Sequence, residues 1–325
     1  MIYLLIAASV IFDFLNGFHD SSNIVATVIS SRAMKPRTAL YMTAVAEFVA
    51  PFLFGVAVAT TVGSELLEPD AITIEVVLAG VLAAIVWNLI TWFIGMPSSS
   101  SHALLGGLLG AGLVAFGVGV IKIEGLTKIL LALLLSPLLG FIVSYLLMHF
   151  LLFISRGATP RINSVYRRAQ VFTSLGLALS HGSNDAQKTM GIITMGLVAG
   201  GFQETFHVPT WVIFLSASSM ALGIATGGWR LIRTLGGRIY KIRPIDAFTS
   251  QLASAAVIFG ASAVGGPVST TQVVGSAIMG AGAADRINKV RWQVGKSMLV
   301  TWVLTVPAAA IVAALIYGVI LLFMP

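Results

Sequence analysis

Gly17-Phe18-His19-Asp20-Ser21-Ser22-Asn23 interrupts a long apolar run near the start of the chain, and His181-Gly182-Ser183-Asn184-Asp185-Ala186-Gln187-Lys188 interrupts another. Both stretches place a carboxylate and an amide among apolar neighbours. A charged side chain at the centre of a bilayer costs about 2.5–3.5 kcal/mol or more. A chain that bears this cost twice, at corresponding places, is expected to use these residues and not merely to pack them.

The composition around these stretches indicates an integral membrane protein. Of the 325 residues, 57% are hydrophobic and 10% are charged, whereas soluble domains carry about 25% charged residues. A membrane span needs about 20 apolar residues, so the first and sixth apolar stretches are long enough for a span plus a half-helix, with breaks expected at Gly17 and Gly182. The apolar stretches run at about 1–30, 38–63, 73–95, 97–118, 126–154, 168–200, 208–228, 246–265, 267–284 and 292–323.

Loop charges orient the chain. Basic residues follow the first, fifth, seventh and ninth stretches, and acidic residues follow the second and sixth. If each stretch crosses once and the N-terminus lies outside, the basic loops are cytoplasmic and the acidic loops are outside. The loop from Lys122 to Lys128 is ambiguous. The pattern predicts a multi-pass protein of the plasma (inner) membrane with both termini extracytoplasmic. It also explains the net charge of +7 by the basic cytoplasmic loops, so nucleic acid is not expected as a partner.

The chain also repeats itself. Asp20 and Asp185 are 165 positions apart, and Pro97-Ser98-Ser99-Ser100-Ser101-His102 matches Pro267-Val268-Ser269-Thr270-Thr271-Gln272 at a distance of 170. Matching motifs in the same order predict an internal duplication. Five crossings per half, an odd number, place the second half upside down, as in secondary transporters. We expect an all-α integral membrane protein of about 10–12 transmembrane or half helices in two inverted repeats, 1–154 and 168–325, with a cytoplasmic linker at 155–167 and broken helices at the midplane.

The proline-hydroxyl motifs are candidate anion sites. Each predicts a helix N-terminus, where free backbone N–H groups, hydroxyl donors and the positive end of the helix dipole bind an oxyanion without arginine. Two such termini from opposite sides of the membrane could converge on one tetrahedral anion. The alternative is a serine-rich turn with tight small-residue packing. The candidate anion-site residues are Asp20, Asn23, Ser99, Ser100, Ser101, His102, Asn184, Asp185, Lys188, Ser269, Thr270, Thr271 and Gln272.

The acidic motifs point to a coupling cation. Hard cations such as Na⁺ take carboxylate, amide and hydroxyl oxygens. An unpaired aspartate would repel a neighbouring anion by about 4 kcal/mol at 4 Å and an effective dielectric constant of 20, and a cation between them reverses the sign; a proton on the aspartate would act less directly. The candidate Na⁺ ligands are Asp20, Asn23, Glu47, Asn184 and Asp185. Glu47 could instead be a proton site or a lipid-shielded partner of a basic group.

At these residues the chain resembles the inorganic phosphate transporter family. That family carries a GxxD-type motif near both ends, here Gly17 to Asp20 and Gly182 to Asp185, and a proline-hydroxyl motif in each half. The resemblance implies cation-coupled phosphate symport through an inverted-repeat fold, with Na⁺ or H⁺ as the cation, sometimes a metal–phosphate complex, and sulfate in some relatives. The second copy departs from the Asp-x-x-Asn form, because Lys188 stands where Asn23 stands in the first.

The function predicted is therefore secondary active symport of inorganic phosphate coupled to Na⁺ by alternating access, with H⁺ coupling, metal–phosphate transport and sulfate transport as alternatives. No enzyme activity and no organic cofactor are expected. An open anion channel conflicts with paired aspartates, and an intramembrane hydrolase at Ser101 and His102 conflicts with helix geometry, since adjacent helical residues do not face each other. The partners expected are phosphate, Na⁺ or H⁺ and the lipid bilayer; homo-oligomerisation is left open.

Overall fold

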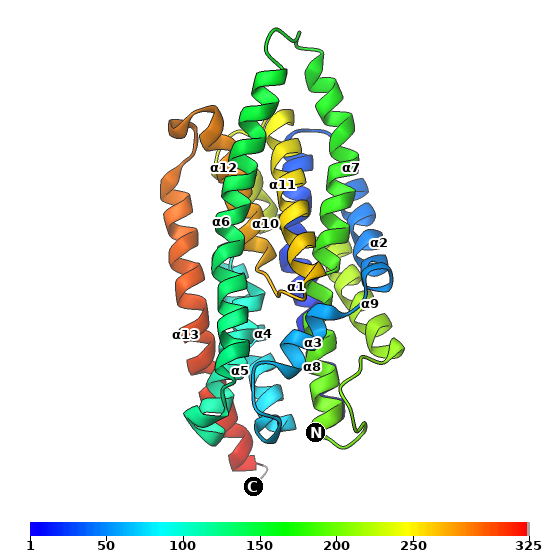
Figure 1. The fold of residues 1–325 in the computed structure, drawn as a ribbon, viewed down its shortest axis with the longest axis vertical. Helices are drawn as coiled ribbons and strands as arrows, with labels where there is room; N and C mark the ends of the chain where they lie inside the picture. Colours follow the sequence, from blue (N-terminus) through cyan, green and yellow to red (C-terminus); the bar gives the residue numbers. More distant parts are fainter. Residues whose placement is uncertain (324–325) are drawn as a thin grey trace.

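The computed structural model describes residues 1–323 and shows a bundle of α-helices, with no β-strand in that range (Figure 1). Both termini lie at the same end of the bundle, and α6 and α7 extend furthest at the other end. The helices are α1 (Ile2–Ser30), α2 (Pro36–Phe54), α3 (Ala57–Ser64), α4 (Ile74–Ile94), α5 (Ser100–Phe116), α6 (Ile123–Ile154), α7 (Ile162–Gly182), α8 (Asp185–Ala199), α9 (Thr210–Thr226), α10 (Trp229–Arg233), α11 (Pro244–Ala263), α12 (Thr270–Asp285) and α13 (Trp292–Phe323).

Several helices have the length and composition of membrane spans. α1, α4, α6 and α13 each qualify alone, and the bent pairs α2–α3 and α9–α10 qualify when each pair is taken as one span. α6 and α13 expose many leucine, isoleucine and valine side chains along their length, as helices that face lipid do. The chain is therefore a multi-pass membrane protein, as its composition predicts.

The elements of the second half repeat those of the first in the same order. α7 and α8 correspond to α1, α9 and α10 to α2 and α3, α11 to α4, α12 to α5, and α13 to α6. Even the bends correspond: α2 meets α3 at 80° across Gly55, and α9 meets α10 at 59° across Gly227. Both glycines have positive φ, +78° and +72°, a region that side chains with a Cβ rarely adopt. This order agrees with the predicted all-α inverted-repeat fold class.

The break expected at Gly17 is absent. α1 runs without interruption from Ile2 to Ser30, whereas the second copy does break, between Gly182 and Asp185. A Cβ on Gly17 would overlap the carbonyl oxygen of Met220, and one on Gly223 would overlap that of Phe14. The prediction was wrong because this glycine serves the close approach of α1 and α9, a usual role of small residues between membrane helices.

The expectation of one crossing per apolar stretch does not hold for α5 and α12, which are too short to cross alone. α4 and α5 lie together on the side of the termini, and α11 and α12 lie together on the opposite side (Figure 1). α5 and α12 have 17 and 16 residues, about 25 Å at 1.5 Å per residue, which is less than a bilayer's apolar thickness. The connecting segments 97–99 and 267–269 are buried. We interpret each pair as a re-entrant hairpin, although α4 alone has the length of a span. Each half then has three crossings where five were expected, which is still an odd number.

Two groups of loop residues pair as their charges suggest. Lys128 contacts Glu65 at 2.8 Å and Lys122 contacts Glu68 at 4.0 Å. The basic residues of the ambiguous 122–128 loop are thus partnered by the preceding acidic loop on the same side of the bundle. Between the halves, α6 ends at Ile154 and α7 begins at Ile162, so the non-helical connection is shorter than the linker expected at 155–167.

Candidate ion-binding site

The tips of the two hairpins meet in the interior of the bundle. Ser101 Oγ at the start of α5 donates to the Val268 carbonyl at 3.0 Å, joining the two tips directly. Ser99 Oγ accepts from His102 N at 3.1 Å, and Ser269 Oγ accepts from Gln272 N at 3.4 Å. These two candidate residues are therefore the N-caps of α5 and α12, and the residues that follow them present hydroxyls at each N-terminus.

The first aspartate, Asp20 on α1, is surrounded by hydrogen-bond donors from both halves. Asp20 Oδ1 accepts from Asn23 Nδ2 at 3.0 Å and from Thr271 Oγ1 at 2.9 Å. Ser100 Oγ donates to Asp20 Oδ2 at 3.4 Å, and His19 Nδ1 lies 3.1 Å from Oδ1. All of these side chains are buried, and the carbonyl oxygen of the Asn23 amide has no partner within residues 1–323.

The second aspartate, Asp185 at the start of α8, has a related environment in which an ammonium group is the main difference. Asp185 Oδ2 accepts from Thr270 Oγ1 at 2.8 Å, and Oδ1 accepts from the ammonium group of Lys188. Lys188 Nζ also donates to Ser101 Oγ at 2.6 Å and to the Val268 carbonyl at 2.8 Å. The ammonium group thus fills the space between Asp185 and the tips of both hairpins.

The two aspartate clusters are related by the internal repeat. Asn23 bridges Asp20 and Thr271, and Lys188 bridges Asp185 and Ser101. Each bridge therefore joins an aspartate of one half to the hairpin tip of the other. The carboxylates themselves converge, because one oxygen each of Asp20 and Asp185 and one nitrogen of His181 lie within 4.8 Å of one another.

His181 connects this centre to a further carboxyl group. His181 Nε2 lies 3.3 Å from Asp185 Oδ2, and Nδ1 lies 2.8 Å from Glu47 Oε1; all three side chains are fully buried. A Cβ on Gly182 would crowd Glu47, so the glycine allows α2 to approach α7 here. Glu47 faces the protein interior next to His181, and not the lipid.

Asn184 is a candidate in both the anion and the cation set, but the structure gives its side chain other contacts. Asn184 Nδ2 donates to Ser262 Oγ at 2.9 Å and to the Gly266 carbonyl at 3.1 Å, and Oδ1 accepts from Val268 N at 3.2 Å. These bonds hold the tip of the α11–α12 hairpin against the α7–α8 break. The geometry thus supports a positioning role for Asn184 instead of direct ion binding.

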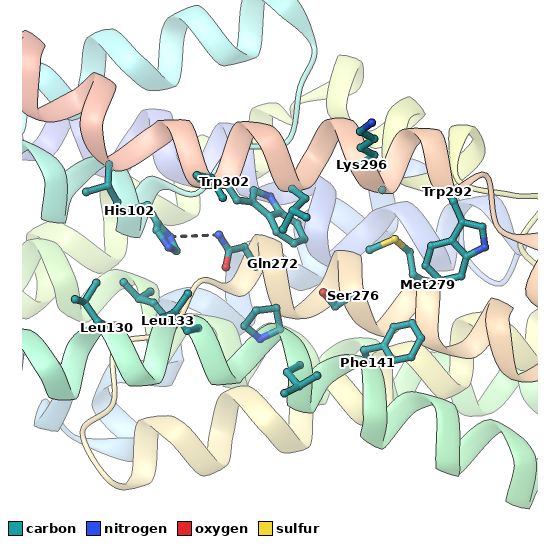
Figure 2. Close-up of a pocket in the computed structure, with 17 residues that line it drawn as sticks. His102, Leu130, Leu133, Phe141, Gln272, Ser276, Met279, Trp292, Lys296 and Trp302 are labelled. Atoms are coloured by element: carbon teal, nitrogen blue, oxygen red, sulfur yellow. Dashed lines mark hydrogen bonds between the residues drawn. The ribbon is translucent and has the colours of Figure 1, made fainter.

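His102 and Gln272, the last residues of the two matching motifs, meet across the repeat, with Gln272 Nε2 3.4 Å from His102 Nδ1 (Figure 2). They form one end of a cavity of about 740 Å³ between α6, α12 and α13. Leucine side chains, Phe141, Trp292 and Trp302 dominate its lining. This large cavity is too apolar for a multiply charged anion, whereas the cavity that reaches Ser101 and Lys188 is about 20 Å³, room for about one water molecule. The candidate centre is closed in this conformation.

Sequence reasoning missed the buried carboxyl group of Asp13, which lies near the candidate site in the sequence of α1. Asp13, on α1, is fully buried and accepts from Thr189 Oγ1 at 2.6 Å. It belongs to a polar stripe along one face of α1 that includes Ser9, Asn16 and Asp20. The spacing of these residues, alternately three and four positions, was the signal that could have revealed it.

The fold and the centre define a class of protein: a multi-pass membrane protein with two hairpin tips and two buried aspartates at its midpoint. A family model described as the phosphate transporter family matches residues 16–313. The chain belongs to this family, whose members are transporters and not enzymes. Both the family resemblance and the absence of enzyme activity predicted from the sequence are thereby confirmed.

Relatives agree with this assignment over almost their whole length. A Bacillus subtilis (strain 168) protein named "Probable low-affinity inorganic phosphate transporter" is 43% identical over 98% of this chain and 96% of its own. A Rhizobium meliloti (strain 1021) protein of the same name is 42% identical over 96% and 94%. A solved structure named "The sodium-dependent phosphate transporter" matches with a TM-score of 0.89 at 24% identity, covering 99% of both chains. This last likeness confirms the fold class.

Proposed function

We propose that this phosphate transporter is a secondary active symporter that couples inorganic phosphate to Na⁺ by alternating access. One observation carries the proposal: two hydroxyl-rich helix N-termini, one from each half, meet beside two aspartates whose oxygens lie within 4.8 Å of each other. The N-termini suit an anion and the aspartates suit a cation. Neither ion is compatible with the centre without the other.

The anion site consists of the N-termini of α5 and α12. The first N–H groups of a helix have no intrahelical acceptor, and the dipole adds positive potential there. Ser100, Ser101, Thr270 and Thr271 supply hydroxyls at the same termini. The ammonium group of Lys188, in contact with Ser101, supplies a full positive charge at this position. Together these groups suit a tetrahedral dianion such as hydrogen phosphate.

The cation site is centred on Asp20. Asp20, the unpartnered Asn23 carbonyl oxygen, and the hydroxyls of Ser100 and Thr271 form an all-oxygen set, the kind that hard cations prefer. Phosphate adds negative charge next to Asp20, Asp185 and Glu47, and Lys188 neutralises only part of it. A cation at Asp20 removes that repulsion, which makes cation and anion binding mutually dependent.

Lys188 makes the two halves unequal. Its ammonium group takes, at Asp185, the place that the Asn23 amide takes at Asp20. We infer that Lys188 acts as a tethered cation on the Asp185 side, so the transported Na⁺ is needed mainly on the Asp20 side. Na⁺ dependence is also the property named for the solved structure of the same fold.

Proton coupling is the second candidate, and the Glu47–His181 pair favours it. Two titratable groups lie 2.8 Å apart, fully buried, and His181 also reaches Asp185. A proton moving within this group would change the charge of the centre without Na⁺. The same anion site would accept sulfate, which is also a tetrahedral oxyanion.

Alternating access follows from the repeat. The expected repeats 1–154 and 168–325 contribute one hairpin each, and the hairpins enter from opposite sides (Figure 1). Displacing one tip at a time would open the closed centre to one side only. With the N-terminus outside, as loop charges predict, the α4–α5 hairpin lines the extracytoplasmic path and the α11–α12 hairpin lines the cytoplasmic path in an inner membrane.

The test is uptake of labelled phosphate into proteoliposomes under an imposed Na⁺ gradient or an imposed H⁺ gradient. We expect accumulation with the Na⁺ gradient. In Asp20→Asn, Na⁺ binding should weaken by at least about tenfold, because a charged ligand is lost, and phosphate binding should become insensitive to Na⁺. Reciprocity requires that phosphate also lose its effect on Na⁺ affinity, which calorimetric titration of each ligand with and without the other can measure.

The matched control is Asp70→Asn, the same change at an exposed loop aspartate; it should leave both titrations unchanged. Undiminished mutual enhancement in Asp20→Asn would show that the cation binds elsewhere. Accumulation driven by the H⁺ gradient alone would replace Na⁺ with H⁺ as the coupling ion.

A further inference from the structure

The Asp13 carboxyl group is buried and makes no ion pair within residues 1–323. It lies seven residues before Asp20 on the same face of α1, about 10 Å along the helix axis. One carboxyl oxygen, Oδ1, accepts from Thr189 Oγ1 at 2.6 Å. The other, Oδ2, has no hydrogen-bond partner within residues 1–323, and the side chain is fully buried. A carboxylate in this position needs a cation or a proton.

Other oxygens around Asp13 are also without partners. Asn16 Oδ1, Ser216 Oγ and Ser9 Oγ are buried and unpartnered in the described chain. Asn16 and Ser9 are three positions after and four positions before Asp13, which places them on the same face of α1. Ser216, on α9, lies near the Asp13 carboxyl group, and its hydroxyl is outside hydrogen-bond geometry with any group of residues 1–323. Unpartnered buried polar atoms are rare in native structures, and here two of them share a helix face with the unpartnered oxygen of Asp13.

This set matches the preference of a small hard cation. It offers a carboxylate, an amide oxygen and hydroxyls, and no nitrogen or sulfur ligand. It draws on three helices of both halves, because Asp13 lies on α1, Thr189 on α8 and Ser216 on α9. The set shares no residue with the Asp20 centre. Asp13 precedes Asp20 on α1, so the set lies on the N-terminal side of that centre along this helix.

We propose that Asp13, Asn16, Thr189 and Ser216 form a second Na⁺ site, separate from the site at Asp20. The proposal rests on the proposed function in one respect, that the ion is the transported Na⁺. With Lys188 serving as the fixed cation at Asp185, the two exchangeable cations are then at Asp20 and at Asp13. Thr189 follows Lys188 directly on α8. A cation bound at Asp13 through Thr189 therefore also stabilises the position of α8, the helix that carries the Lys188 ammonium group.

The test is equilibrium binding of radioactive Na⁺ to the purified full-length protein in saturating phosphate. Asp13→Asn should lower the number of bound Na⁺ by about one per chain while phosphate binding persists, since the Asp20 centre is intact. In proteoliposomes, the dependence of uptake on Na⁺ should become less cooperative. Ser216→Ala removes one ligand with little risk to folding, and it should weaken the affinity of one Na⁺ by about tenfold while keeping the Na⁺ count.

Thr27→Val is the matched control, since Thr27 is a buried polar residue of α1 that bonds to Gln251 at 2.9 Å, away from Asp13. It should keep the Na⁺ count of the unmodified protein. If Asp13→Asn and Ser216→Ala keep both the count and the affinities while Asp20→Asn loses one Na⁺, there is no Asp13 site, and Na⁺ symport stands. If the unmodified protein binds no Na⁺ and transport follows pH, both proposals fail.

Discussion

At the scale of single residues, the difference between Asn23 and Lys188 sets the character of the centre. Both bridge an aspartate to the hairpin tip of the other half. The Asn23 amide brings no charge to Asp20, whereas the Lys188 ammonium group neutralises Asp185. Breaking a buried ion pair by removing one partner costs about 3–5 kcal/mol, so the protein is expected to replace a lost ammonium with a cation from solution.

This expectation leads to a prediction for Lys188→Asn, which restores the Asp-x-x-Asn form in the second half. Phosphate binding should require more Na⁺, with the Hill coefficient for Na⁺ rising by about one, and phosphate affinity at low Na⁺ should fall by at least about tenfold because the tethered charge is gone. Titration of phosphate binding at several Na⁺ concentrations measures both effects.

The control for this change is Lys128→Asn, which removes a partly exposed lysine paired with Glu65. Surface ion pairs contribute little, so its Na⁺ dependence should match that of the unmodified protein. An unaltered Na⁺ dependence in Lys188→Asn would mean that Lys188 is a packing residue and not a substitute for a cation.

At the scale of elements, glycines decide how closely helices approach. α1 and α9 meet where Gly17 faces the Met220 carbonyl and Gly223 faces the Phe14 carbonyl. This contact holds α1 beside the helix that carries Ser216. The position of Asp20 and Asp13 therefore depends on residues that carry no functional group.

Gly17→Ala should consequently destabilise the protein. Its Cβ would overlap the backbone of α9, and overpacking of this kind costs about 1–3 kcal/mol. Thermal unfolding in detergent should show a lower midpoint. The matched change is Gly260→Ala on α11, where a Cβ meets nothing within 4 Å; it should raise the midpoint or leave it unchanged, because alanine favours helix by about 1 kcal/mol over glycine. Equal midpoints for the two variants would contradict a close-approach role for Gly17.

At the scale of the whole molecule, the two re-entrant hairpins change the number of membrane crossings but not the side of the membrane on which each charged loop is predicted to lie. Replacing two crossings by one hairpin leaves the side of every later loop unchanged. The loop charges therefore still predict the same sidedness, with the termini outside, even though α4, α5, α11 and α12 do not each cross.

The cysteine-free chain allows this topology to be labelled directly. Cysteines at Arg32 and Arg161 should react with an impermeant reagent from the cytoplasm, and one at Glu68 should react from outside. Ser98→Cys distinguishes a hairpin from two crossings, because Ser98 is fully buried at the tip and should react from neither side. Labelling of positions 32 and 161 from opposite sides would contradict the inverted arrangement, and strong labelling of Ser98→Cys from the cytoplasm would contradict the hairpin.

The sequence by itself determined that the chain is a multi-pass membrane protein and predicted that it is duplicated, with Asp20, Asp185 and the hydroxyl motifs as its candidate site. These features are local: hydropathy, motif spacing and charge between stretches can be read from neighbouring residues. The family resemblance rested on the same short motifs and is confirmed over residues 16–313.

Only the tertiary structure decided which contacts the individual residues of these motifs make. Whether Gly17 breaks a helix or admits a neighbour depends on α9, about 200 residues away in the chain. The partners of Asn23, Asn184 and Lys188 lie 248, 78 and 87 positions away, so no local pattern could show that Asn184 positions a hairpin tip or that Lys188 reaches Ser101. The polar stripe on α1 could have revealed Asp13 itself, but not its neighbours from other helices, because only the packing of α8 and α9 brings Thr189 and Ser216 to it.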